Sequence, residues 1–178
     1  MRDKRGNSLV VIEGDSLTVY ALDDKREWTV GRQSKENNPD IRLQSLSVSR
    51  HHGKLVNTDG VWFYADINEG NGTVYNGKHI ENSSLITLQT GDILIFGKED
   101  DTNIDINTAW ALFTARFCDE VWNVADTEGF ERIIFSADNE NHTFDNPKTG
   151  MVFENDNGIA IYMGAVTFIV GDIKVSGV

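Results

Sequence analysis

Short apolar stretches with alternating polar residues, separated by Gly-, Asn- and Asp-containing turns, are the feature that most constrains the fold of this chain. Residues 9–12 and 17–20 flank the sequence EGDS, and residues 54–56 and 61–64 flank NTDG. Both arrangements predict β-hairpins. Similar stretches recur as far as residue 117, and the chain has 16 Gly but only two Pro, which suits many tight turns. Turns about every 8–12 residues are typical of an all-β sandwich.

Helical periodicity is absent from the first part of the chain. No stretch before Arg116 repeats its apolar residues with the 3.6-residue period of an amphipathic helix. Residues 118–124 are the one candidate for a short helical turn. The longest apolar run, 159–170, is interrupted by Gly164 and Thr167 and is shorter than the roughly 20 residues of a membrane-spanning helix. It is interpreted as two strands, so the end of the chain is expected to be a small β-rich element.

Charge and cysteine content exclude several classes of protein. The net charge is −12, whereas proteins that bind nucleic acid need clustered Lys and Arg. Residues 116–178 hold 4 basic and 11 acidic residues, a net charge of −7, which leaves −5 for residues 1–115. The single cysteine, Cys118, cannot form an intrachain disulfide and fits a reducing compartment. No secretory signal is visible, so we expect a cytoplasmic chain without nucleic-acid partners or membrane insertion; a place within a larger protein stays open.

Four short polar pieces interrupt the strand pattern between residues 28 and 77. They are Gly31 with Arg32, Ser49 with Arg50, His51 and His52, Asn71 with Gly72 and Thr73, and Asn76 with Gly77. A phosphate dianion needs several hydrogen-bond donors at once to offset the loss of its water. Cationic and hydroxyl side chains on loops supply such donors, and loops at one end of a sandwich are a common place for a binding site. The pattern therefore indicates anion binding.

Catalytic, metal and cofactor patterns are not found. Residues 101–107 are similar to the start of a calcium loop, but that loop needs Gly at its sixth position and Glu at its twelfth. Ile106 and Leu112 occupy those positions. The four His lack an HExxH spacing, and no nucleophile has an evident base. We expect no catalytic residue, no metal and no cofactor, and hence a non-enzymatic protein.

The four polar pieces between residues 28 and 77 resemble, in their order and spacing, the forkhead-associated (FHA) domain, a phosphothreonine-binding β-sandwich. Asp66, Gly97 and the sequence GDI at 91–93 extend the resemblance, which covers about residues 8–115. It implies an all-β, FHA-type β-sandwich of about eleven short, mostly antiparallel strands. Residues 116–178 are then a β-rich C-terminal extension or a partial second domain, in which no motif is recognised.

The resemblance also implies roles for individual residues. Phosphopeptide binding is assigned to Arg32, Ser49, Arg50, Asn71, Gly70 and Lys35. Structural support of the site is assigned to Gly31, His52, Gly72, Thr73, Asn76 and Gly77. Arg32 and Ser49 would hold the phosphate, and Arg50 would contact phosphate or peptide. Asn71 would bond the peptide backbone. Lys35 lies in the loop expected to select the peptide, with a solvated lysine as the equal alternative.

The sequence departs from the family pattern at Glu69 and Gly70. The family commonly has Ser or Thr before Asn-Gly-Thr, whereas Gly70 lacks a hydroxyl and Glu69 adds a negative charge. Two functions therefore stay open. The first is phosphothreonine-dependent protein binding in Ser/Thr-kinase signalling. The second is an FHA-fold scaffold for unphosphorylated protein, such as the cytosolic tandem-FHA part of a bacterial type VII secretion ATPase.

Overall fold

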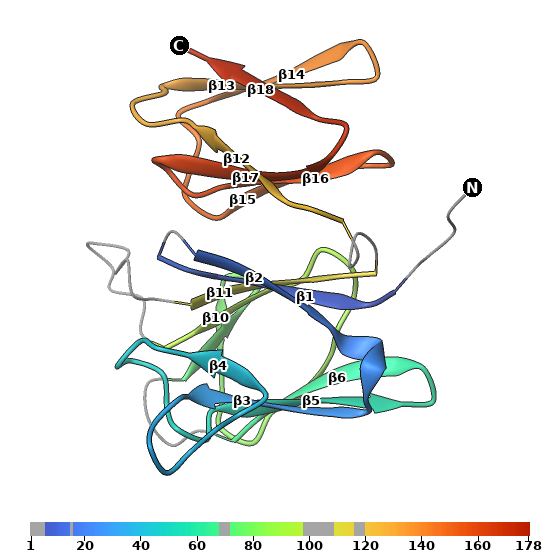
Figure 1. Ribbon diagram of the computed structural model, residues 1–178, viewed down its shortest axis with the longest axis vertical. Coiled ribbons are helices and arrows are strands. Elements are labelled where there is room, and N and C mark those ends of the chain that lie inside the picture. The colour runs from blue at the N-terminus through green and yellow to red at the C-terminus, as the bar shows by residue number, and fades with distance from the viewer. Residues whose placement is uncertain (1–5, 15, 68–71, 98–108, 116–119) are drawn as a thin grey trace. The chain divides into compact units, whose positions relative to one another are not determined.

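The computed structural model describes residues 6–14, 16–67, 72–97, 109–115 and 120–178. Contacts divide the chain into two compact units, Met1–Cys118 and Asp119–Val178, and each is described by itself. Strands dominate both (Figure 1), which confirms the all-β prediction. Within the described residues the helical structure is limited to one 3₁₀ turn, η1 (Leu22–Asp24), and no helix there is long and apolar enough to cross a membrane.

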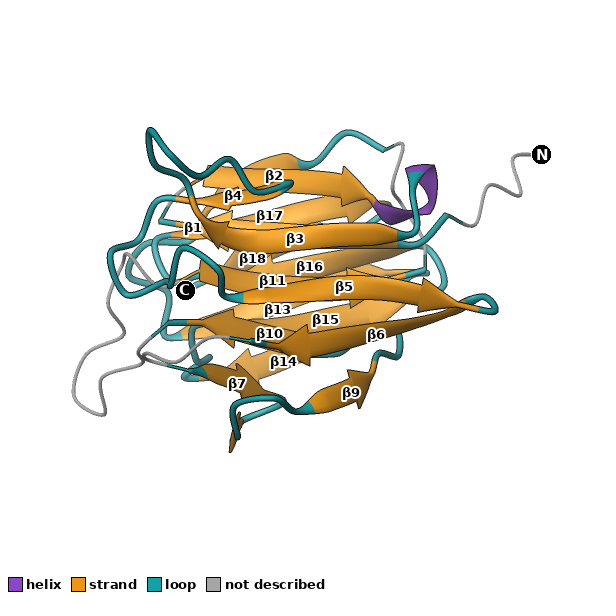
Figure 2. Ribbon diagram, turned by 90° about the horizontal axis from the view of Figure 1, so that it is seen from below, coloured by secondary structure: helices purple, strands orange, loops and turns teal. Residues whose placement is uncertain are grey.

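The first unit is a sandwich of two sheets that contain eleven strands in the described residues. The six-stranded sheet has the order β2 (Ser16–Ala21), β1 (Ser8–Glu13), β11 (Ala109–Thr114), β10 (Ile93–Phe96), β7 (Thr73–Tyr75), β8 (Lys78–Ile80). The five-stranded sheet has the order β4 (Ile41–Leu43), β3 (Glu27–Arg32), β5 (Gly53–Thr58), β6 (Val61–Asp66), β9 (Leu85–Thr87), as seen in Figure 2. Every pair is antiparallel except β3 with β4, which is parallel.

Alternation along the strands builds the core between these sheets. On β6, Trp62 and Tyr64 are buried in the core, whereas the alternate residues Val61, Phe63 and Ala65 are more exposed. Phe96 from the opposite sheet packs against Tyr64, with ring centroids 5.6 Å apart. Because side chains of a strand point alternately to its two faces, a two-residue period is sufficient to direct these large rings inward.

Two-residue turns fix the register of the predicted hairpins. Asp59 and Gly60 both have positive φ, 52° and 84°, and connect β5 to β6 with Thr58 opposite Val61. Asn76 and Gly77, with φ of 47° and 85°, connect β7 to β8 in the same way. Asn-Gly and Asp-Gly favour this left-handed geometry, which matches the twist of the strands. The hairpins predicted at residues 9–20 and 54–64 are both present.

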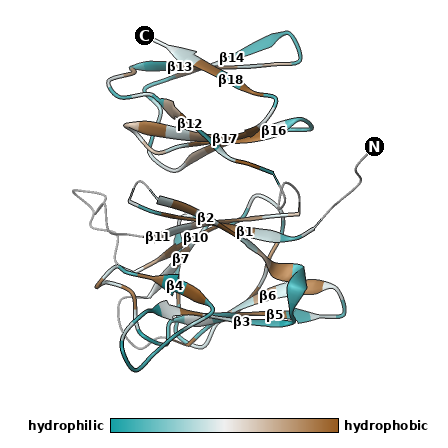
Figure 3. Cartoon of the chain, viewed as in Figure 1, coloured by the Kyte–Doolittle hydropathy of each residue, from teal (hydrophilic) through white to brown (hydrophobic). Residues whose placement is uncertain are grey.

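Three longer connections meet at one end of the first unit. They join β3 to β4, β4 to β5, and β6 to β7. Val30 pairs with both Ile41 and Gly53, and Gly53 pairs with Asp66, so the ends of these strands lie next to one another. The connection that follows β3 is strongly hydrophilic (Figure 3). This end of the sandwich is where most of the predicted site residues lie.

The second unit is a smaller antiparallel sandwich. Its four-stranded sheet has the order β12 (Asn123–Asp126), β17 (Val166–Gly171), β16 (Gly158–Tyr162), β15 (Met151–Asn155). Its three-stranded sheet has the order β14 (Glu140–Asp145), β13 (Arg132–Ala137), β18 (Lys174–Gly177). The strand pair predicted within residues 159–170 is confirmed as β16 and β17. Rings of Phe135 and Phe153 stack in its core at 5.0 Å.

The prediction of a helical turn at residues 118–124 is wrong for the residues of this range that the structure describes, 120–124. Residues 118 and 119 lie outside the described residues, and Asn123 and Val124 begin β12, paired to Ile169 and Phe168. Pairing with β17 gives the backbone of this short segment hydrogen bonds to a neighbouring strand, and a helical turn would not form them. A short apolar stretch can serve either structure, and partners distant in the sequence then decide between them.

Candidate binding site

The end of β3 and the β4–β5 connection are in direct backbone contact. The N–H of Arg32 donates to the carbonyl of Ser49 over 3.0 Å, and the N–H of His52 donates to that of Val30 over 3.0 Å. Gly31 lies so close to this connection that an added Cβ would be 1.9 Å from the carbonyl oxygen of Arg50. The backbone hydrogen bonds hold Arg32 close to Ser49 and Arg50, and this approach is possible because Gly31 has no side chain.

Replacing Gly31 with alanine is expected to destabilise the first unit by about 3 kcal/mol, because the backbone must separate to admit the methyl group. Gly60→Ala is the control, since no atom lies within 4 Å of a Cβ there, although its positive φ carries a strain of its own. The measurement is urea unfolding of both variants followed by tryptophan fluorescence. Equal losses in the two variants would contradict the close approach at Gly31.

The His52 side chain forms hydrogen bonds that link the β4–β5 connection to the start of β7. It is fully buried, and its Nδ1 accepts the N–H of Ser49 at 3.0 Å. An Nδ1 that accepts cannot carry a proton, so Nε2 carries it and faces the carbonyl of Gly72 at 2.9 Å and the hydroxyl of Thr73 at 3.0 Å. The neutral Nε2–H tautomer is thus the form that satisfies all three contacts. His52 holds Ser49 in place and does not itself face solvent.

Burial lowers the pKa of His52, because the charged imidazolium loses its water inside the unit. The Asp66 carboxylate and the carbonyl of Gly72 act in the opposite direction and offset only part of this effect. Phe96 packs edge-on against the imidazole, with centroids 5.6 Å apart. The environment therefore favours the neutral ring that the hydrogen bonds require.

The Arg32 side chain has a hydrogen-bond donor that none of the described residues accepts. Its Nε is buried and has no hydrogen-bond partner among the described residues, and the same is true of the hydroxyl of Ser34 two positions later. By contrast, Lys54 is paired with a carboxylate, at 3.2 Å from Glu27. A buried guanidinium nitrogen is costly without an acceptor. Arg32 therefore has an unfilled hydrogen-bond position within the part of the chain that the structure describes.

The remaining predicted residues fall into three groups: side chains exposed on the connections, a hairpin pair, and residues outside the described part of the chain. Arg50 and Lys35 are exposed on their connections, where their side chains are open to a ligand. The hairpin pair Asn76 and Gly77 is also exposed, but the Asn76 amide is used within the domain: Nδ2 donates to Asp92 at 3.0 Å and Oδ1 accepts the N–H of Ile93 at 2.8 Å. The predictions for Glu69, Gly70 and Asn71 lie outside the described residues, as do those for Cys118 and for the stretch 101–107.

Two residues near the site were not singled out from the sequence. The Asn37 side chain donates to the carbonyls of Arg32 and Arg50, and the Glu13 carboxylate accepts the N–H groups of Gln44 and Ser45 at 2.9 Å. In the sequence, Asn37 belongs to the breaker NNP and Glu13 to a turn. The available signal was a side chain of the right type in a turn, which does not specify a partner far along the chain.

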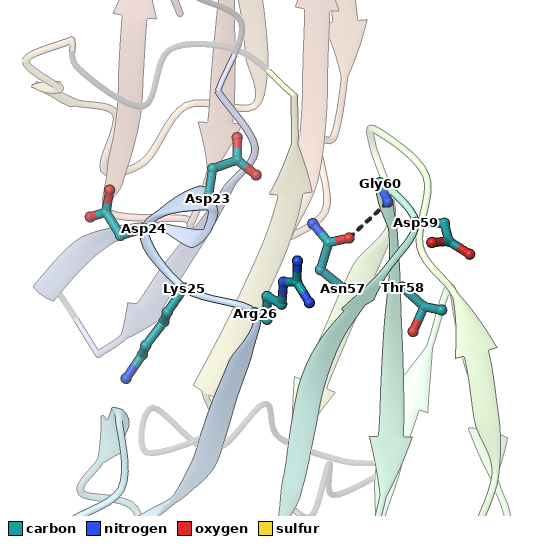
Figure 4. A pocket seen from close by; sticks show the side chains of 8 residues that line it. All are labelled: Asp23, Asp24, Lys25, Arg26, Asn57, Thr58, Asp59 and Gly60. Carbon is teal, nitrogen blue, oxygen red and sulfur yellow. Dashed lines mark hydrogen bonds between the residues drawn. The ribbon is translucent and has the colours of Figure 1, made fainter.

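A separate cleft lies at the other end of the first unit, between η1 and the β5–β6 turn (Figure 4). Its volume is about 680 Å³, and its lining residues are Asp23, Asp24, Lys25, Arg26, Asn57, Thr58, Asp59 and Gly60. Three of these are carboxylates, which disfavour a phosphate. Asn57 is already occupied, since its Oδ1 accepts the N–H of Gly60 at 2.9 Å (Figure 4). Among the described residues, no three His, Cys, Asp or Glu side chains gather as metal ligands.

Comparison with known proteins identifies a family that matches this chain. Residues 28–97 match the family model of the FHA domain. The match lies within the first unit and confirms the resemblance of that unit to the FHA domain. A curated relative, the oxoglutarate dehydrogenase inhibitor of Corynebacterium efficiens, is 33% identical over 94 residues, which are 52% of this chain and 62% of the relative. The match thus spans less than two thirds of that relative.

Solved structures show the same fold. The yeast Pml1 splicing factor aligns with a TM-score of 0.52 at 20% identity, over 64% of this chain and 83% of that protein. The FHA domain of CT664 from Chlamydia trachomatis aligns with a TM-score of 0.50 at 23% identity, over 63% of this chain and 99% of that domain. FHA domains are phosphopeptide-binding modules and are generally non-enzymatic.

Proposed function

We propose that this FHA domain binds phosphothreonine-containing proteins in cytoplasmic Ser/Thr-kinase signalling, and that it acts by binding alone. The observation that carries the proposal is the environment of Arg32. Its buried Nε has no hydrogen-bond partner among the described residues, and its backbone N–H is bonded to Ser49, the other predicted phosphate donor. This backbone bond holds next to each other two residues that carry a guanidinium and a hydroxyl, the donor types that suit a phosphate dianion.

Each residue of the proposed site is assigned a contact with the phosphorylated peptide. Arg32 grips two phosphate oxygens with its guanidinium, and the Ser49 hydroxyl donates to a third. Arg50 and Lys35 are exposed and contact the phosphate or the peptide on either side of it. Asn71, with Gly70 beside it, lies next to Gly72 in the sequence and is assigned to the peptide backbone. Each charge-assisted bond contributes roughly 1.5–3 kcal/mol.

Two or three such bonds, with a few peptide contacts, correspond to a binding free energy near −8 kcal/mol, or about micromolar affinity. That strength suits reversible signalling. The curated relative is named as an inhibitor of an enzyme, so a regulatory role through binding is in keeping with the match.

The test is titration of the full chain with a degenerate phosphothreonine peptide library and the same library unphosphorylated. We expect about micromolar dissociation constants for the best phosphorylated peptides and at least a hundredfold weaker binding of their unphosphorylated forms, since the phosphate supplies the charge-assisted bonds. Isothermal titration calorimetry on selected peptides gives the constants. Equal affinity for both forms would instead support the scaffold function for unphosphorylated protein.

A further inference from the structure

The side chain of Asn37 bonds the backbones of both predicted phosphate-binding arginines, Arg32 at the end of β3 and Arg50 in the β4–β5 connection. Its Nδ2 donates to the carbonyl of Arg32 at 3.1 Å and to the carbonyl of Arg50 at 2.7 Å. Arg32 ends β3, and Arg50 lies 18 residues later in the β4–β5 connection. One amide group therefore bonds the backbones of both residues, although neither Asn37 nor its neighbours belong to the recognised motif.

The segment that carries Asn37 is itself ordered by a tight turn. The N–H of Ser34 donates to the carbonyl of Asn37 at 2.9 Å, and the N–H of Asn37 donates back to Ser34 at 3.3 Å. Lys35 and Glu36 form the exposed tip of this turn. The side chain of Asn37 is thus presented from a closed turn, and it is half-buried where it bonds the carbonyls of Arg32 and Arg50. Its position is set by the turn as well as by its two acceptors.

The chemistry of the contact requires an amide. One –NH₂ group has two protons, one for each carbonyl, and carries no charge. A carboxylate has only acceptor oxygens and would repel both carbonyls, whereas alanine would leave both unbonded. Fixing a carbonyl fixes the plane of the peptide group that follows the residue and restricts ψ, one of the two backbone angles that set the direction of the Cα–Cβ bond. The amide therefore restricts the backbone at the base of both arginine side chains.

We propose that Asn37 is a positioning residue, which holds Arg32 and Arg50 in the arrangement that grips a phosphorylated peptide. The inference rests on the proposed function, since it concerns the same site. Asn37 does not touch the ligand in this account. It lowers the cost of binding by fixing the two arginine backbones before the peptide arrives, which is the energetic role of preorganisation.

The first test measures binding of the best phosphothreonine peptide to the full chain and to Asn37→Ala. We expect about tenfold weaker binding, which corresponds to the loss of roughly one net hydrogen bond's contribution to the bound arrangement. Asn57→Ala is the matched control, because Asn57 bonds a turn backbone at the other end of the unit. Its affinity should stay within about twofold of the wild type. An Asn37→Ala affinity within the same twofold range would overturn the inference.

A double-mutant cycle separates positioning from general stabilisation. In the background of Arg32→Ala with Arg50→Ala, neither cationic side chain remains at the site to be positioned. Asn37→Ala should then change the peptide affinity by at most about twofold, measured by NMR titration. A tenfold effect that persisted in this background would show that Asn37 acts without the arginines. Failure of the wild type to prefer phosphorylated peptide is a different result, which overturns the proposed function itself.

A second measurement on the wild-type chain avoids any dependence on a variant that fails to fold. The side-chain amide protons of Asn37, bonded to two carbonyls, should exchange with water at least about tenfold more slowly than those of exposed Asn38. NMR exchange spectroscopy of the ¹⁵N-labelled chain measures both. Equal exchange rates for the two amides would show that the bonds to Arg32 and Arg50 do not persist in solution.

Discussion

Arg32→Ala is expected to weaken phosphothreonine-peptide binding by about a hundredfold, because two charge-assisted hydrogen bonds to phosphate are lost and nothing replaces them. The fold should be retained, since Arg32 contributes its backbone N–H, not its side chain, to the bond with Ser49. Removing the side chain also removes the buried Nε that has no partner in the described part of the chain. Calorimetric titration with a phosphorylated peptide measures the change.

Two further variants sharpen this result. Arg26→Ala removes the same charge at the opposite end of the unit, in the cleft of Figure 4, and should leave affinity within about twofold. Arg32→Lys keeps the charge but loses the two-pronged geometry, and we expect an intermediate loss. If Arg32→Ala and Arg26→Ala bound peptide equally well, Arg32 would not be the phosphate contact.

His52→Gln is expected to destabilise the first unit by about 2–4 kcal/mol, because a fully buried ring that bonds three backbone and side-chain partners is lost. The flexible amide carries both of its polar atoms at its end, so it cannot bond Ser49 and Gly72 on opposite sides while packing against Phe96. The control is His79→Gln on β8, where the side chain is exposed. Urea unfolding of the full chain, followed by tryptophan fluorescence, should show a large loss for His52→Gln and little for His79→Gln.

The same histidine predicts how stability depends on pH. Because burial lowers its pKa below the ordinary value of 6.5, the unfolded chain binds a proton that the folded chain excludes. Its contribution to stability is complete above that value and is lost as pH falls toward the lowered pKa, by at most about 1.4 kcal/mol per pH unit. Wild type should therefore lose more stability than His52→Gln between pH 7 and pH 5. Parallel curves for the two proteins would show that His52 does not titrate in this way.

Much of the fold could be predicted from local pattern. Alternating apolar residues predicted the strands, and the dipeptides at Asp59 and Asn76 predicted where hairpins turn, because those backbone angles suit few residue types. The ordered motif around Arg32 and Ser49 predicted the family before any contact was known. Such features depend on residues within a few positions of one another, and so they can be read along the chain.

Contacts between distant residues could not be predicted in this way. Nothing in the sequence pairs Asn37 with Arg50, 13 positions away, or Glu13 with Gln44, 31 positions away. The prediction of a helical turn at Asn123 and Val124 is wrong, because the strand that pairs with them, β17, lies more than 40 residues later. The tautomer of His52 likewise follows from Ser49 and Gly72 approaching opposite sides of one ring.

Strand content, turn positions and the residue types of the proposed anion-binding site follow from the amino-acid sequence, because each depends on local backbone preference and side-chain chemistry. The folded arrangement is needed to show that Arg32 and Ser49 share a backbone hydrogen bond, that His52 is held neutral, and that Asn37 connects the two arginine backbones. Those properties arise where sheet pairing closes distant connections onto one another, and burial then fixes which hydrogen bonds must be made.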